Sequence, residues 1–159
     1  MLAKRIAVHR ETPGPLAPPL QRTDDALGTC RARVLLAEDD PALRELMAGA
    51  LRRDGYEVLE ASDGTELLDR LEAIVTTVGR GPDAVAVIIS DIRMPGLTGL
   101  DLLAALRCAE WTTPVILITA FGDEETHREA RELGARAVLD KPFPLEQLRA
   151  AVQEAVPRC

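Results

Sequence analysis

The sequence predicts an α/β domain in which five parallel strands form one doubly wound sheet with helices on both faces. Two patterns carry this prediction. From residue 33 onward, short apolar runs alternate with segments of helical periodicity, about one pair for every 20–25 residues, which is typical of repeated βα units. The run at residues 84–90 is apolar almost throughout, as expected of a strand covered on both faces. Right-handed crossovers then connect the strands.

The first strand is expected at residues 33–37, and Asp40 and Pro41 begin the helix that follows. Aspartate is a favourable N-cap, and proline suits the first helical position because the amide there has no helical partner. Asp54-Gly55 ends this helix. Its predicted buried face comprises Leu43, Leu46, Met47, Ala50 and Leu51.

The second βα unit begins with a strand at residues 56–61. Ser62 or Asp63 is expected to cap the next helix, and the glycines and proline of residues 79–82 end it. The apolar stripe of this helix comprises Leu67, Leu68, Leu71, Ile74, Val75 and Val78.

The second half of the domain repeats the alternation after the strand at residues 84–90. The helix expected at residues 123–133 is dense in charge, a pattern that usually marks a solvated face, and Gly134 suits its C′ position. The other predicted elements are a helix at 97–108, strands at 114–118 and 135–139, and a last helix at 144–155.

Residues 1–32 differ from the rest of the chain, with four prolines between positions 13 and 19. We expect them to form a disordered, proline-containing arm, and residues 33–156 to form the folded domain. Because the chain ends soon after the last predicted helix, no appended output domain is expected.

The overall composition excludes several classes of function. With 26 acidic and 19 basic residues the net charge is −7, which argues against direct nucleic-acid binding because that requires a basic face. No apolar run approaches the roughly 20 residues of a membrane span. The three cysteines (Cys30, Cys108 and Cys159) lack metal-ligand or disulfide spacing, so a reducing, cytoplasmic setting is expected.

Charged and hydroxyl side chains follow four of the predicted strands. They are Glu38 and Asp39 after the first strand, Asp91 after the third, Thr119 after the fourth and Lys141 after the fifth. In a 2-1-3-4-5 strand order these ends meet at the switch point, where open α/β sheets bind ligands. Clustered carboxylates repel unless a cation joins them, and oxygen-rich sites suit Mg²⁺. A hydroxyl and an ammonium beside a metal suit a phosphoryl group.

Four motifs at these strand ends together resemble the receiver domain of two-component response regulators. They are residues 34–41 (VLLAEDDP), residues 90–96 (SDIRMPG) with Gly99-Leu100, residues 118–120 (ITA) and residues 140–143 (DKPF). The resemblance covers residues 33–155 and implies the flavodoxin-like (βα)5 fold of stand-alone, CheY-like receivers.

The resemblance implies that Asp91 accepts a phosphoryl group from a phosphohistidine on a histidine kinase or phosphotransfer protein. It also implies a bound Mg²⁺ or Mn²⁺ ion. The implied metal ligands are Asp39, Asp91, the backbone carbonyl of Arg93 and, mainly through water, Glu38.

Thr119 is implied to hydrogen-bond the phosphoryl group and Lys141 to pair with it, with a cis peptide bond between Lys141 and Pro142. Phosphorylation is then expected to be signalled by contact with a downstream protein, whose identity the residues do not indicate. The chain is accordingly expected to be a switch that assists its own phosphorylation and dephosphorylation, not an enzyme.

The sequence departs from the family pattern at Val138, where many receivers carry an aromatic residue whose rotation reports phosphorylation. Valine is small and its χ1 is restricted, so a large side-chain rotation is absent at this position. Either another surface reports phosphorylation or the coupling is weak. Phe121 is a possible local substitute, or simply an exposed aromatic residue.

Three other interpretations differ from the stand-alone receiver. A hydrolase of the haloacid-dehalogenase type needs a second acid two residues after the nucleophile. This chain has Arg93 at that position, which argues against such a hydrolase. A pseudo-receiver that binds partners without phosphorylation is an alternative, as is the receiver part of a truncated transcription factor.

Overall fold

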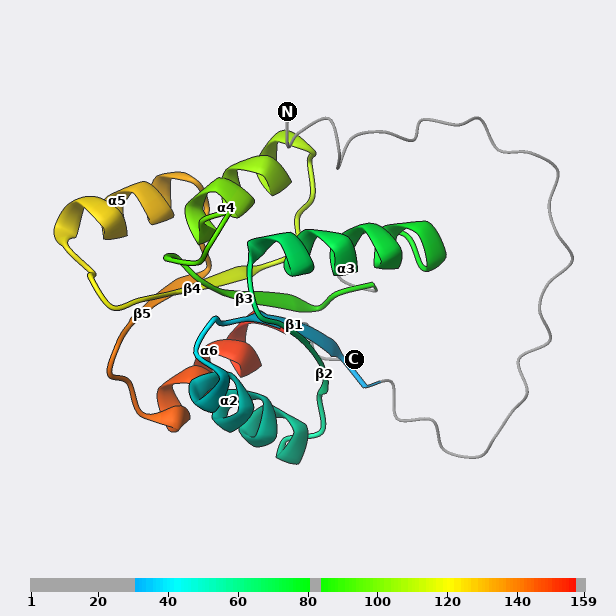
Figure 1. Ribbon diagram of the computed structural model, residues 1–159, viewed down its shortest axis with the longest axis horizontal. Helices are drawn as coiled ribbons and strands as arrows, with labels where there is room; N and C mark the ends of the chain where they lie inside the picture. Colours follow the sequence, from blue (N-terminus) through cyan, green and yellow to red (C-terminus); the bar gives the residue numbers. More distant parts are fainter. Residues whose placement is uncertain (1–30, 81–83, 157–159) are drawn as a thin grey trace, which may run out of the picture.

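The computed structural model describes residues 31–80 and 84–156, which form one sheet between two layers of helices (Figure 1). Its five strands are parallel and lie in the order β2-β1-β3-β4-β5, which confirms the predicted fold class and strand order. The strands are β1 (Arg33–Ala37), β2 (Glu57–Ala61), β3 (Val87–Asp91), β4 (Val115–Thr119) and β5 (Ala137–Asp140).

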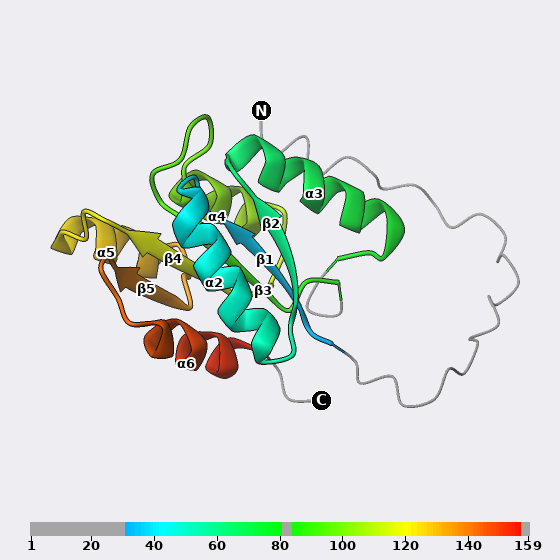
Figure 2. The ribbon, with the colours of Figure 1, turned by 60° about the horizontal axis from the view of Figure 1, so that its bottom comes forward.

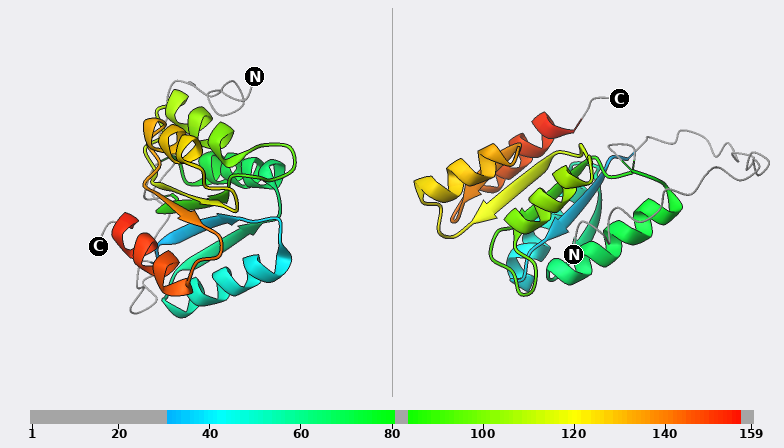
Figure 3. Two further views of the ribbon diagram at one scale, coloured as in Figure 1. Left: turned by 90° about the vertical axis from the view of Figure 1, so that its left-hand side faces the viewer. Right: turned by 90° about the horizontal axis from the view of Figure 1, so that it is seen from above.

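Helices cover both faces of the sheet, as Figure 3 shows. One face carries α2 (Pro41–Arg53) and α6 (Leu145–Ala155), and the other carries α3 (Gly64–Thr77), α4 (Gly99–Cys108) and α5 (Glu124–Glu132). Successive residues of a strand face opposite sides. Val34 and Leu36 therefore join the core beneath α2 and α6, whereas Leu35 and Ala37 join the core beneath the other three helices.

Three strands, β3, β4 and β5, end one residue later than predicted, and in β3 and β4 this places a site residue inside the sheet. β3 begins at Val87 instead of residue 84 and includes Asp91, while β4 includes Thr119. Asp91 pairs in register with Ile118, and Thr119 with Asp140. Asp91 and Thr119 belong to their strands because each still pairs with a residue of the neighbouring strand, so the sheet fixes the positions of both.

The predicted buried faces of two helices each contain one error. The side chains of Leu46 and Val78 are 52% and 55% exposed. Leu46 lies at the margin of the α2 stripe, which is centred on Met47 and Leu51. Val78 is the C-cap of α3, beyond the last turn that packs on the sheet.

The helix ends follow the predicted capping chemistry. Asp40 accepts hydrogen bonds from two amides of the first turn of α2 at 2.9 and 3.2 Å, and Asp63 rather than Ser62 caps α3. Gly134 adopts a φ of +85° after α5. The Lys141–Pro142 peptide bond is cis, as the resemblance implied.

The predicted disordered arm, residues 1–32, lies outside the described residues except for Arg31 and Ala32. Within the part of the chain that is described, none of the helices combines the length and apolar character needed to cross a membrane.

Candidate phosphoryl and metal site

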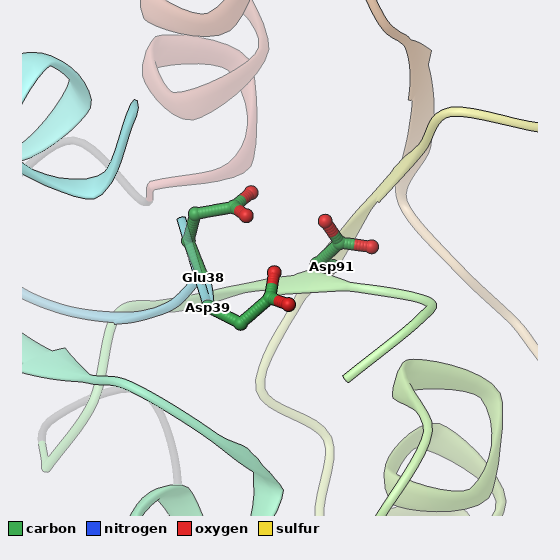
Figure 4. Close-up of side chains that lie close together, drawn as sticks. All are labelled: Glu38, Asp39 and Asp91. Carbon is green, nitrogen blue, oxygen red and sulfur yellow. The ribbon is translucent and has the colours of Figure 1, made fainter. Parts of the chain in front are cut away.

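Three carboxylates converge where β1 and β3 end. Glu38 and Asp39 directly follow β1, and Asp91 is the last residue of the adjacent strand β3. The side chains point toward one another in Figure 4, and one oxygen from each lies within 4.8 Å of the others. Because neighbouring parallel strands end at the same edge, residues far apart in the sequence meet here.

Glu38 is fully buried, and its two carboxylate oxygens have different surroundings. Oε1 accepts a hydrogen bond from the backbone N–H of Asp40 at 3.1 Å. Oε2 lies 2.9 Å from Nζ of Lys141 as an ion pair, yet it accepts no hydrogen bond of good geometry from the described residues. An incompletely paired buried oxygen is costly, so this atom is suited to a cation or an ordered water.

Lys141 bridges the two buried carboxylates. Its Nζ donates a hydrogen bond to Oδ2 of Asp91 at 2.5 Å, while Oδ1 of Asp91 accepts one from the backbone N–H of Arg93 at 2.9 Å. Burial favours the neutral amine, but the hydrogen bond to Asp91 and the ion pair with Glu38 outweigh it and raise the pKa of Lys141. The ammonium is therefore the charge partner of Asp91 before any reaction.

The cluster still carries more negative than positive charge. Burial raises the pKa of Glu38 to about 7, and the charge of Asp91 adds to this effect, while Lys141 and the N–H of Asp40 oppose it only in part. Three carboxylates with a buried, incompletely paired oxygen fit a hard divalent cation such as Mg²⁺. The donor set is thus consistent with the predicted metal site.

We expect the stability of the metal-free protein to fall as the pH rises from about 4.5 to about 7. A carboxyl group whose pKa rises from 4.5 to about 7 on folding stabilises the folded state only while it is protonated, so its contribution is complete below the unfolded pKa and lost above the folded one. For Glu38 the loss is roughly 3 kcal/mol. Urea unfolding in the presence of a chelator, measured across this pH range, tests the expectation. Glu38→Gln should flatten the profile, and an unchanged profile would assign the dependence to another group.

Thr119 lies at the same edge, at the end of β4, and is 2% exposed. Its Oγ1 accepts a hydrogen bond from the backbone N–H of Phe121 at 3.0 Å, which leaves the hydroxyl proton available for donation. The N–H of Lys141 donates to the carbonyl of Thr119 at 2.7 Å. This bond holds the strand ends that carry the hydroxyl and the ammonium side by side.

Arg93 and Phe121 meet above these strand ends. The guanidinium carbon of Arg93 lies 4.3 Å from the centre of the Phe121 ring, although the ring itself is 61% exposed. A cation–π contact therefore joins the loop after Asp91 to the loop after Thr119. Val138, at the position where many receivers carry an aromatic residue, is half-buried against the core beneath α3, α4 and α5.

Comparison with known proteins decides the family. A family model described as "Response regulator receiver domain" matches residues 34–153. The chain belongs to this family. Receiver domains are the signalling switches of two-component systems, they generally bind Mg²⁺ in an acidic pocket, and they interact with histidine kinases or phosphotransfer proteins and with downstream targets.

Individual relatives agree with this assignment. The receiver is 35% identical over 137 residues to the transcriptional regulatory protein PdtaR of Mycobacterium tuberculosis, covering 86% of this chain and 62% of that protein. The chain thus spans about three fifths of that relative. It is 30% identical over 125 residues to sporulation initiation phosphotransferase F of Bacillus subtilis, covering 79% of this chain and 94% of that protein.

Solved structures give the same result. The chemotaxis response regulator CheY4 of Vibrio cholerae superposes with a TM-score of 0.66 at 32% identity, covering 79% of this chain and 99% of that one. The CheY-like fold expected from the motifs is therefore confirmed.

The predicted site residues of this receiver meet at one edge of the sheet, but the sequence did not reveal how closely the backbone packs around them. A Cβ on Gly99 would lie 2.7 Å from the carbonyl oxygen of Asp91. Only glycine allows α4 to begin this close to the end of β3. Gly99 in the motif after Asp91 was the feature of the sequence that could have indicated this close packing.

His127 lies in the charged helix α5. Its Nε2 lies 2.8 Å from Oδ1 of Asp140, the last residue of β5.

Proposed function

We propose that this receiver is a phosphorylation-controlled switch that accepts a phosphoryl group on Asp91 from a phosphohistidine on a histidine kinase or phosphotransfer protein. The observation that carries the proposal is the placement of Asp91 at the end of β3, bound to Lys141 and beside two further carboxylates. A nearly buried carboxylate with these neighbours is suited to phosphoryl transfer, because positioned positive charge offsets the negative charge of the reacting group.

In the proposed reaction, a carboxylate oxygen of Asp91 attacks phosphorus, the P–N bond of the phosphohistidine breaks and the imidazole leaves. Asp91 is held for this attack by the N–H of Arg93 on one oxygen and by Lys141 on the other. Lys141 is then proposed to pair with the transferred group, and Thr119 to donate its hydroxyl proton to it.

A divalent cation, Mg²⁺ or Mn²⁺, would lower the charge of this cluster when bound. The proposed ligands are Asp39, Asp91 and the backbone carbonyl of Arg93, with Glu38 acting mainly through water. The support is the convergence of the three carboxylates and the incompletely paired oxygen of Glu38.

Output is proposed to occur by contact with a downstream protein in the cytoplasm, without direct binding to nucleic acid or membrane and without turnover of a substrate. Phosphorylation adds roughly −1.5 to −2 charge to the pocket and biases a two-state surface. We propose that a change at Thr119 reaches the surface through Phe121, whose N–H donates to the Thr119 hydroxyl and whose exposed ring contacts Arg93, without involving Val138.

Incubation with Mg²⁺ and acetyl phosphate tests this function. Intact mass should show one added phosphoryl group on the parent and none on Asp91→Asn. Beryllofluoride binding, which mimics the phosphoryl group, should likewise require Asp91. A parent that takes up neither reagent and binds no Mg²⁺ would support a pseudo-receiver instead.

A second candidate is a receiver that forms part of a longer regulator. PdtaR extends beyond the matched region, and the receiver covers 35% of the transcriptional activator protein PfeR of Pseudomonas aeruginosa. Sporulation initiation phosphotransferase F, of which 94% is matched, favours the stand-alone form. Both candidates share the same proposed phosphoryl chemistry.

A further inference from the structure

An arginine outside the predicted site contacts the backbone of the loop that carries Glu38 and Asp39, two of the proposed metal ligands, which we call the metal-binding loop. Arg44 lies in the first turn of α2, where its backbone N–H donates a hydrogen bond to the carbonyl of Asp40 at 2.9 Å. Its Nη1 donates to the carbonyl oxygen of Glu38 at 2.7 Å. Helical side chains lean toward the N-terminus, so a residue one turn into α2 is well placed to reach back to the loop that precedes the helix.

The contact constrains both neighbouring acids. The carbonyl of Glu38 and the N–H of Asp39 belong to one planar peptide, so fixing the oxygen fixes the plane from which Asp39 projects. The preceding peptide is held separately, because the N–H of Glu38 donates to the carbonyl of Ala61 in β2 at 3.2 Å. Asp39 is itself exposed, so its direction depends on this backbone.

Arg44 is in turn anchored by β2. Its Nε lies 3.5 Å from Oε2 of Glu60, and its side chain is only 20% exposed. Glu60 also pairs with Arg52 at 2.8 Å. Figure 2 shows α2 lying alongside β1 and β2. The two ion pairs join Glu60 of β2 to Arg44 and Arg52 of this helix.

We propose that Arg44 is a positioning residue for the metal-binding loop: anchored on Glu60, it holds the Glu38–Asp39 peptide in the orientation that aims both carboxylates at the site. This inference rests on the proposed function, since it assigns a purpose to that loop. A charge-assisted hydrogen bond to a carbonyl is well suited to the role because it adds no further ligand to the cluster.

The chain supplies a matched control for this proposal. Arg52 is on the same helix, pairs with the same Glu60 and donates to one backbone carbonyl, that of Val58, at 3.0 Å. Arg44→Met and Arg52→Met therefore remove the same kinds of contact, but only the first touches Glu38. A purely structural role predicts the same behaviour for both variants.

The experiment measures Mg²⁺ affinity by calorimetry, and the amide resonance of Asp39 in the metal-free full chain by NMR. We expect Arg44→Met to weaken Mg²⁺ binding roughly tenfold, the scale seen when residues that orient metal ligands are removed, and Arg52→Met to change it less than about twofold. The Asp39 amide should shift or broaden in Arg44→Met alone. At saturating Mg²⁺, phosphorylation of Arg44→Met by acetyl phosphate should recover to near the parental rate.

Equal Mg²⁺ affinities for the two variants, or an unmoved Asp39 amide, would overturn the role of Arg44. If Arg44→Met does not fold, Glu60→Gln tests the same anchor more gently: Mg²⁺ binding weaker than in the parent supports the proposal, and parental binding contradicts it. A parent that binds no Mg²⁺ would instead refute the proposed function, while the Asp39 amide would still report whether Arg44 orders the loop.

Discussion

Asp39→Asn should make the metal-free protein more stable and remove its stabilisation by Mg²⁺. In the absence of metal, three carboxylates cluster and the ammonium of Lys141 pairs with only two of them, Glu38 and Asp91, so deleting the negative charge of Asp39 relieves repulsion. Because Asp39 is exposed, water screens much of this repulsion, and we expect a gain of about 1 kcal/mol. The parent should gain about 2.7 kcal/mol when Mg²⁺ is present at 100 times its dissociation constant, and the mutant much less.

Urea unfolding with a chelator and with Mg²⁺ measures both effects. Asp40→Asn is the matched control, because it removes the adjacent charge while asparagine preserves the N-cap of α2. This control should keep most of the Mg²⁺-dependent gain. An Asp39→Asn protein that is stabilised by Mg²⁺ as strongly as the parent would remove Asp39 from the metal site.

Lys141→Met should destabilise the metal-free protein and slow phosphorylation by acetyl phosphate. The methionine side chain replaces much of the lysine stem but leaves Glu38 and Asp91, which are 0% and 4% exposed, without their shared cation. Breaking a buried pair costs about 3–5 kcal/mol, and we expect about 1–3 kcal/mol because Glu38 can take up a proton. Loss of one positioned charge should slow the transfer on the order of 100-fold.

A double-mutant cycle separates the charge effect from packing. Asp91→Asn in the Lys141→Met background should recover part of the lost stability, since it deletes the charge left without a partner. The cost of Lys141→Met should also shrink below about pH 5, because Glu38, whose pKa is raised to about 7 by folding, is already protonated in the folded state there. Equal costs at pH 5 and pH 8, without recovery in the double mutant, would show that Lys141 acts through packing instead of charge.

Local patterns in the sequence determined the fold and the members of the candidate site. Strand and helix periodicity, the caps at Asp40 and Gly134 and the almost wholly apolar run at residues 84–90 depend on neighbours within a few residues, so they can be read along the chain. The edge at which Glu38, Asp91 and Lys141 meet followed from the chirality and order of a parallel sheet. The family motifs then assigned their expected roles.

Tertiary structure decided what depends on distances between segments. Whether Leu46 is buried depends on how α2 is rotated against the sheet, and the raised pKa of Glu38 depends on complete burial beside Asp91. The reach of Arg44 to the Glu38 carbonyl needed the helix geometry and Glu60 in β2. The sequence by itself thus determined which charged residues share one edge of the sheet. Only packing determined which oxygen atoms are paired there, because pairing is set by ångström-scale contacts between elements that are remote in the chain.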